Sequence, residues 1–241
     1  MTAPVGAGGP PSGATDGGWD DTRPGDTVFQ KLRHDLARAL RFHTNRNEPR
    51  WKRILRLLFH FGTQAVVVHR LGECARRVRI PVVRELLLVL YAVAKFLVQI
   101  TIGVVIARQA KIGKGLVIHT VHGVFVGATR IGENCYLQHG VVISYAVKQI
   151  GDNCYFGPGA KVFGHIRIGN NVMVGANAVA NQDVPDNCYV LGNPGRIVPK
   201  DVARREAAAG GDGAAEAAWA AGSAEAPASL APPCQTGNGS A

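Results

Sequence analysis

The chain has few aromatic and few acidic residues, and both shortages limit the partners it suits. Phe, Trp and Tyr make up 7% of the 241 residues, and Asp and Glu total 17 against 27 Lys and Arg. The formal charge of +10 favours anionic partners such as phosphate-bearing cofactors, anionic lipids or nucleic acid. No nucleic-acid motif accompanies the charge, and stacking aromatics are sparse. We therefore interpret the arginines of the first half as a solvated helix face and expect no nucleic-acid partner.

Two further absences concern the cellular compartment. The N-terminal residues lack the basic stretch followed by an apolar one that marks a secretory signal. The five cysteines are an odd number for a closed disulfide framework, and none of them forms a C-x-x-C pair. From these absences we expect a cytoplasmic protein.

The middle of the chain, in contrast, follows a six-residue period. Apolar residues succeed one another at steps of six, with two steps of seven: Ile106, Ile112, Ile118, Val124, Ile131, Leu137, Ile143, Ile150, Phe156, Val162, Ile168, Val174 and Ala180. A helix would repeat about every 3.6 residues and a plain strand about every 2, so neither explains this period. A hexapeptide repeat is typical of a parallel β-helix, in which each repeat forms one side of a triangular coil. We predict a mostly β fold of this kind, with the apolar residues pointing inward.

Composition divides the chain into four segments. Residues 1–26 are rich in Gly, Pro, Ala, Asp and Thr and are expected to be a disordered leader. Residues 28–103 have the spacing of an α-helical region, and residues 104–200 carry the coils. Residues 204–241 form an Ala/Gly-rich tail that is also expected to be disordered.

Apolar spacing predicts three helices in the second segment. The first contains Phe29, Leu32, Leu36 and Leu40, the second contains Trp51, Ile54, Leu57, Leu58 and Phe61, and the third covers Val82–Gln99 after Pro81. At the other end of the coils, a turn cluster precedes a short strand predicted at Cys188–Leu191.

The run from Leu86 to Ile106 is almost wholly apolar and has about the length of a membrane span. Lys95 interrupts it, and its end, Val104–Ile106, already joins the six-residue period. We interpret it as a buried helix that leads into the first coil. Peripheral membrane contact stays open, because a cluster of arginines precedes the run. These are Arg76, Arg77 and Arg79.

Two cysteines occupy equivalent positions in successive coils. Cys135 and Cys154 each lie in an Asn-Cys-Tyr triplet, so they should be about 4.8 Å apart, one strand spacing. We expect them to pack as reduced thiols in the manner of small apolar groups.

Particular motifs resemble a known family. The residues from Ile150 to Gly164 resemble the closing coils of hexapeptide-repeat serine O-acetyltransferases. Further short motifs continue the likeness: Ile168-Gly169, Val174-Gly175-Ala176-Asn177-Ala178-Val179, Asp183-Val184-Pro185 and Gly192-Asn193-Pro194-Gly195-Arg196-Ile197. Upstream, Leu32-Arg33-His34-Asp35-Leu36 resembles the start of that family's helical region, so the likeness covers roughly residues 28–200.

The resemblance implies a left-handed parallel β-helix and an acyltransferase activity. The enzyme would move an acetyl group from acetyl-CoA to a hydroxyl, with L-serine as first choice, and the O-acetylserine formed would feed cysteine synthesis. The family binds acetyl-CoA in the groove between neighbouring prisms, so we expect a homotrimer, with a dimer of trimers left open. No metal is expected. The matching cofactor positions are Gly159, Ala160, Gly164 and Ala176, with Arg196 or Lys200 placed to meet phosphates.

The family's catalytic histidine position holds Thr120 in this chain, flanked by His119 and His122. The position of its acidic partner holds Val105, and the loop that carries a second family histidine is missing. The coil register places His139 directly over Thr120. Histidine suits a general base because its unperturbed pKa lies near neutrality. We therefore predict His119 or His122 as the base, His139 as orienter or substrate contact, and Thr120 as a substrate contact.

Three alternatives stay open. Relatives on the same frame acetylate sugars or polysaccharides, so the acceptor hydroxyl could belong to a carbohydrate. The loss of the acidic partner is also compatible with a non-catalytic trimeric scaffold that binds CoA or a protein. Zinc-dependent carbonic anhydrases share the architecture, although their histidine spacing differs from the spacing here.

Overall fold

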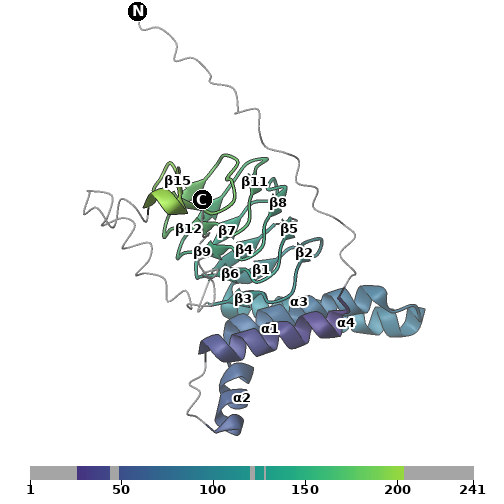
Figure 1. The fold of residues 1–241 in the computed structure, drawn as a ribbon. Helices are drawn as coiled ribbons and strands as arrows, with labels where there is room; N and C mark the ends of the chain where they lie inside the picture. The colour runs from purple at the N-terminus through teal and green to yellow at the C-terminus, as the bar shows by residue number, and fades with distance from the viewer. Residues whose placement is uncertain (1–25, 44–48, 120–122, 128, 204–241) are drawn as a thin grey trace, which may run out of the picture.

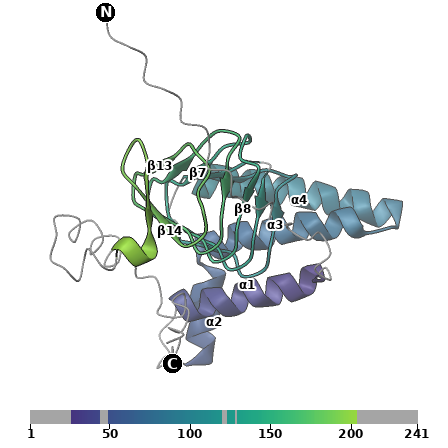
Figure 2. The ribbon, with the colours of Figure 1, turned by 45° about the horizontal axis from the view of Figure 1, so that its top comes forward.

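A computed structural model of the chain describes residues 26–43, 49–119, 123–127 and 129–203. It begins with four helices, α1 (Val28–His43), α2 (Arg50–Leu58), α3 (Phe61–Arg77) and α4 (Pro81–Ile102). The strands of the coils follow, and the helices lie at the end of the stack where the first coil begins (Figure 1). The helix α2 projects away from the coils, whereas α3 and α4 run side by side and extend beyond them (Figures 1 and 2). The expectations for residues 1–25 and 204–241 lie outside the described residues.

The strands of the described chain form three sheets, and successive strands pass from one sheet to the next. Sheet 1 contains β1 (Val104–Ile106), β4 (Val124–Val126), β7 (Val142–Ile143), β10 (Lys161–Val162) and β13 (Val179–Ala180). Sheet 2 contains β2 (Lys111–Ile112), β5 (Arg130–Ile131), β8 (Gln149–Ile150) and β11 (Arg167–Ile168). Sheet 3 contains β3 (Val117–Ile118), β6 (Tyr136–Leu137), β9 (Tyr155–Phe156), β12 (Met173–Val174), β14 (Cys188–Leu191) and β15 (Arg196–Pro199). The molecule is thus a left-handed parallel β-helix preceded by an α-helical region.

The six-residue period forms the core, as predicted. Every residue of the period lies inside the prism with 7% or less of its surface exposed. The register stacks the same positions on one another, for example Ile118 on Leu137 and Leu137 on Phe156. The two steps of seven fall at the corner between sheets 1 and 2, from β4 to β5 and from β7 to β8, and the strands on both sides keep their pairing. The strand predicted at Cys188–Leu191 is β14, and it pairs in antiparallel fashion with β15 to end the stack.

The corner between sheets 3 and 1 is made by residues that tolerate a left-handed backbone. Gly123, Gly140, Gly159 and Asn177 stack there with φ between 54° and 76°. We call this column the glycine corner. A Cβ at Gly159 would collide with the side-chain oxygen of Asn177 as well as straining the backbone. Successive coils therefore approach closely at this corner and leave their backbone near the surface.

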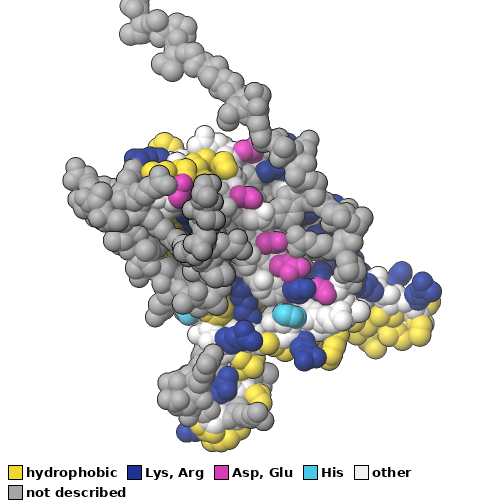
Figure 3. Space-filling view, in the orientation of Figure 1, with side chains coloured by type: hydrophobic (Ala, Val, Ile, Leu, Met, Phe, Trp, Pro, Cys, Tyr) yellow, Lys and Arg dark blue, Asp and Glu magenta, His cyan; other side chains and the backbone are white. Residues whose placement is uncertain are grey.

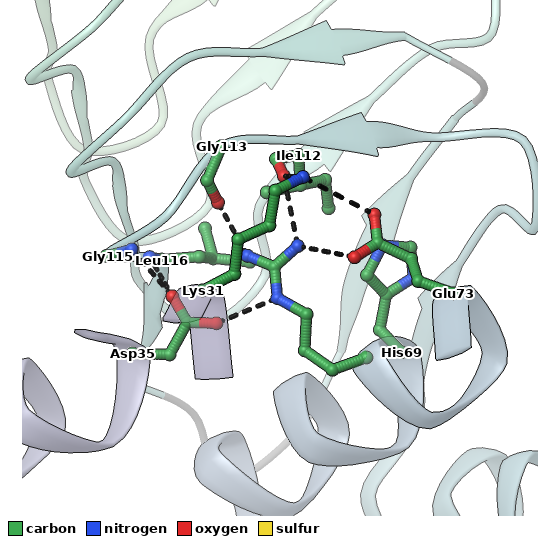
Figure 4. A network of polar contacts seen from close by, with 9 residues as sticks. Lys31, Asp35, His69, Glu73, Ile112, Gly113, Gly115 and Leu116 are labelled. Carbon is green, nitrogen blue, oxygen red and sulfur yellow. Dashed lines mark hydrogen bonds and ion pairs between the residues drawn. The ribbon is translucent and has the colours of Figure 1, made fainter. Parts of the chain in front are cut away.

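A buried ion pair fastens the helical region to the first coil (Figure 4). Arg70 of α3 donates from Nε to Oδ2 of Asp35 in α1 at 2.8 Å, and both side chains are almost fully buried. The other carboxylate oxygen of Asp35 accepts from the backbone N–H groups of Gly115 and Leu116 at 2.6 and 3.0 Å. Arg70 also donates to the carbonyl of Ile112 at 3.0 Å. Two helices and the coil leading into β3 thus share one polar network.

The interpretation of the Leu86–Ile106 run as a buried helix is wrong for most of its length. Its end does form β1, but within α4 the buried residues are Tyr91 and Ile102. Among the described residues, α4 is the helix long and apolar enough to cross a membrane, and 11% of its most apolar window is buried. The reason is that α4 packs on α3 and the first coil along one side, and the described residues leave its opposite side uncovered.

Candidate functional site

His119, one of the predicted catalytic residues, lies immediately after β3 with its side chain exposed. The N-terminus of α3 packs against the end of β3, directly beside His119. A Cβ at Gly62 would overlap the carbonyl oxygen of Ile118, so only glycine permits this approach. The position of His119 relative to the helices therefore depends on how α3 is docked, and hence on Arg70.

His60 precedes α3 and lies beside His119, with ring centroids 6.0 Å apart. Its Nδ1 caps the helix by accepting from the backbone N–H of Thr63 at 3.3 Å. Because this nitrogen accepts, the neutral ring carries its proton on Nε2. Burial lowers the pKa of His60, and nearby His119 lowers it further by charge repulsion. His60 is thus held as a neutral donor at physiological pH.

An aromatic column borders His119 on its other side. The ring of Tyr136 stacks on His119 with centroids 6.3 Å apart, and Tyr155 of the next coil stacks on Tyr136 at 5.3 Å. Phe42 of α1 packs against Tyr136 at 5.2 Å, and Gln138 donates to the hydroxyl of Tyr155 at 3.2 Å. These contacts give one side of the His119 ring a fixed wall built from two coils and a helix.

His139 lies on the next coil and is also exposed. The backbone N–H of His119 donates to the carbonyl of Leu137 at 2.8 Å, so the chain that follows Leu137 runs above the chain that follows Ile118. The carbonyl of His139 in turn accepts from the backbone N–H of Gly159 at 2.9 Å. The remaining predicted site residues, Thr120 and His122, lie outside the described residues.

The structure brings some of the predicted cofactor residues together and separates others. Gly159 belongs to the glycine corner, and Ala160, Ala176 and His139 each adjoin one of its residues in the chain. Ala160 is fully buried, backbone as well as methyl group, so in this protomer it offers no exposed surface to a cofactor. Gly164 follows β10 and lies at the next corner, between sheets 1 and 2.

The two predicted phosphate contacts lie at opposite ends of one strand pair. Arg196 is exposed and pairs with Leu191, at the end of β14 that leads back toward the glycine corner. Lys200 lies at the other end, where its Nζ donates to Asn171 at 2.9 Å and sits 5.4 Å from the ring centroid of Tyr189. Of the two, Arg196 lies on the side of sheet 3 where the parallel strands end, which is also the side where His119 and His139 follow β3 and β6.

The predicted thiol pair is present and inert. Cys135 and Cys154 are free cysteines in adjacent coils, and both are fully buried. The Sγ of Cys135 donates to the carbonyl of Gly151, and burial raises the pKa of the Cys154 thiol well above its usual value. Neither thiol is available as a nucleophile. In the described part of the chain, no group of three or more His, Cys, Asp or Glu side chains could hold a metal ion.

Sequence reasoning missed His60 and Tyr136, the two side chains that frame His119. Tyr136 was recognisable as an outward position beside the inward Leu137, but its stacking on a histidine depends on the preceding coil. His60 gives no comparable indication, because histidine is not among the preferred N-cap residues.

Comparisons with known proteins agree with this geometry. Residues 148–182 match the family described as bacterial transferase hexapeptide (six repeats). A serine acetyltransferase of Synechococcus elongatus is 37% identical over 150 residues, which cover 59% of this chain and 59% of that protein. A serine acetyltransferase of Helicobacter pylori is 33% identical over 156 residues, which cover 60% of this chain and 85% of that protein.

Among solved structures, soybean serine acetyltransferase complexed with serine matches with a TM-score of 0.56 and 30% identity, over 70% of each chain. The chain therefore spans little more than half of the cyanobacterial relative but most of the Helicobacter one. Sequence and fold together lead to one assignment: the chain belongs to the serine acetyltransferase family of hexapeptide-repeat proteins.

Proposed function

We propose that this protein transfers the acetyl group of acetyl-CoA to the hydroxyl of L-serine, which yields O-acetylserine and free CoA. The observation that carries the proposal is the position of His119. An exposed imidazole lies at the end of β3, framed by His60 and Tyr136, one residue from the position where the family resemblance places its catalytic base. The relatives named as serine acetyltransferases support serine as the acceptor.

In the proposed mechanism His119 removes the proton from the acceptor hydroxyl as its oxygen attacks the thioester carbonyl. The tetrahedral intermediate then collapses, the carbon–sulfur bond breaks, and the departing thiolate takes the proton from the imidazolium. General base catalysis of this kind contributes about 10²- to 10⁴-fold to the rate. His122, outside the described residues, is the alternative base.

His60 has a separate role in this proposal. Its Nδ1 caps α3, and its lowered pKa keeps the ring neutral. A neutral neighbour avoids the repulsion that a second imidazolium would impose when His119 becomes protonated. We assign His60 to holding the ring of His119 in position, and His139 to contact with the acceptor.

The donor is placed along the glycine corner, where closely stacked backbone allows the pantetheine arm to approach. Gly159 and Ala176 supply this surface, and Arg196 meets the phosphates. The groove would be completed by a neighbouring prism, so the active form we propose is a homotrimer, with the partly exposed aliphatic residues Val142 and Val179 of sheet 1 available for contact. A cytoplasmic location would give it access to acetyl-CoA.

An acceptor panel tests the function directly. Release of CoA thiol from acetyl-CoA is followed with L-serine, with a set of neutral sugars and with no acceptor. Turnover that depends on serine is the expected result. Thiol release with sugars alone would instead support carbohydrate acetylation, which one observation favours: Val105, at the family's acidic position, pairs in β1 with Phe125 and offers no carboxylate. No acceptor-dependent release with either class would contradict an acetyltransferase function.

A further inference from the structure

The outer side of α4 is an uncharged apolar stripe. Its residues are Leu86, Val89, Leu90, Val93, Phe96, Leu97 and Ile100, all strongly exposed, with Leu86 at 70% and Phe96 at 60%. At 100° per residue they fall within about 120° of the helix circumference and extend about 21 Å along it. The one charged residue in this stretch, Lys95, is half-buried and lies on the packed side with His69 and Tyr91. We call this surface the α4 stripe.

The α4 stripe offers almost no polar group to a partner. The hydroxyl of Thr101, next to its end, donates to the carbonyl of Leu97 at 2.7 Å and is thereby satisfied within the helix. Protein interfaces carry about one hydrogen bond per 100–200 Å² and have a polar rim. A surface of apolar side chains over a hydrogen-bonded helix backbone is instead suited to hydrocarbon, which supplies no hydrogen bonds.

Basic residues adjoin the stripe where α3 turns into α4. The segment from Cys74 to Leu86 contains Arg76, Arg77, Arg79 and Arg84 against a single acid, Glu85, so its net charge is +3 (four minus one). Glu85 forms an exposed ion pair with Arg84 at 3.0 Å. Ile80, 61% exposed, lies among the arginines. Figure 3 shows basic and apolar side chains together on the part of the helical region that extends beyond the coils.

The protruding helix α2 repeats the same chemistry. Trp51, Ile54 and Leu55 are exposed on one side of it, and Lys52, Arg53 and Arg56 follow the other side. It contains no acidic residue, and the ammonium of Lys52 lies 5.4 Å from the ring centroid of Trp51. Basic amphipathic helices with Trp, Leu and Ile on the apolar side are typical of segments that lie in a membrane interface.

We propose that the helical region binds an anionic lipid bilayer, with the α4 stripe entering the boundary between headgroups and acyl chains and the arginines of the α3–α4 turn contacting lipid phosphates. A contact between two copies of the chain is less well suited to this surface. It would bring two arginine clusters of the same charge toward each other, whereas phosphate headgroups neutralise them. The helix lies on the membrane and does not cross it, because its inner side stays packed on α3 and the first coil.

Vesicle co-sedimentation of the full chain tests this proposal. Phosphatidylcholine vesicles are compared with vesicles that also contain phosphatidylglycerol, each at low and high salt. We expect binding to the anionic vesicles and its weakening by salt. The variant Phe96→Glu, with a charge in the middle of the stripe, should lower the apparent affinity about tenfold or more. The triple variant Arg76→Glu, Arg77→Glu, Arg79→Glu should lower it as well.

The matched control is Val202→Glu, which places the same charge on an exposed apolar residue at the far end of the coils. It should bind vesicles like the parent protein. The mass of each variant is measured in parallel by sedimentation velocity without lipid, and its fold by circular dichroism. Absence of vesicle binding by the parent protein, or binding that neither variant weakens, would overturn the proposal. So would a Phe96→Glu variant that folds but has a smaller assembly mass, because the stripe would then be a contact between copies.

Discussion

Arg70 and Asp35 are 35 positions apart in the sequence, yet the guanidinium Nε lies 2.8 Å from the carboxylate in a buried contact that joins α3, α1 and the coil leading into β3. The pKa of Asp35 is raised above its usual value by burial, and the charge and hydrogen bond of Arg70 oppose this rise. The pair therefore depends on both partners, and its position makes it the link between the helical region and the candidate site.

Replacement of Arg70 by Met should destabilise the fold by about 3–5 kcal/mol, because it leaves the carboxylate of Asp35 buried without its partner. Urea unfolding followed by circular dichroism measures the loss. The matched control is Arg84→Met, which breaks the exposed Arg84–Glu85 pair and should cost about 1 kcal/mol or less. The double variant Asp35→Leu, Arg70→Met should recover part of the loss. Equal effects of Arg70→Met and Arg84→Met would contradict the assigned role.

Stability should fall as the pH drops from 7 to 5, in part because of His69. Burial lowers the pKa of His69 from 6.5 to about 4. Between these values the unfolded chain binds a proton that the folded chain does not, so stability is full above pH 6.5 and declines as the pH falls toward 4. The expected loss at pH 5 is about 2 kcal/mol.

Urea unfolding at several pH values measures this dependence, and the variant His69→Phe should reduce its slope. A smaller slope should remain, because the pKa of His60 is also lowered by burial. A slope in His69→Phe equal to that of the parent protein would show that His69 is not the titrating group.

Gly62→Ala should be harmful although alanine favours helices by about 1 kcal/mol over glycine. The added methyl group would meet the backbone carbonyl of Ile118, which cannot move aside without shifting β3 or α3. Overpacking of this kind costs about 1–3 kcal/mol, and the displacement of His119 should lower kcat as well. In the control Gly175→Ala the nearest atom is a flexible side-chain carbon of Leu191 at 3.1 Å. Thermal melting and kcat together compare the two variants, and a stable, fully active Gly62→Ala would contradict the close docking of α3.

The variant His60→Asn separates the two roles of His60. Asparagine is a good N-cap, so α3 should keep its cap and the protein its stability. The imidazole beside His119 is lost, and we expect kcat/KM to fall about tenfold, chiefly through kcat. A lower melting temperature with a proportional loss of activity would indicate that His60 has a purely structural role. Unchanged activity in a stable variant would indicate the same.

The sequence was sufficient to predict the coils but not the way in which the helices pack against them. Each residue of the period from Ile106 to Ala180 was correctly identified as inward, because one apolar position per side is a strict geometric requirement of the prism. The stacking of Cys135 and Cys154 followed from the same register. The proximity of His60 to His119 could not be predicted, since it arises from the docking of α3 through Arg70 and Gly62.

The exposure of α4 was missed for a related reason. An apolar sequence indicates that a helix avoids water, but it does not identify what covers the helix. Leu86, Phe96 and Ile100 have no partner residue within the described chain that would bury them, as their exposures of 60% or more show. The burial inferred for this run therefore required a partner that the described residues do not supply.

The most direct measurement of the central claim is kcat/KM for acetyl transfer to L-serine in His119→Ala, compared with the parent protein and with His34→Ala, which removes an exposed histidine of α1. Our account predicts a loss of about 10²-fold or more in His119→Ala and an unchanged value in the control. A folded His119→Ala variant with the activity of the parent protein would contradict the assignment of His119 as the base.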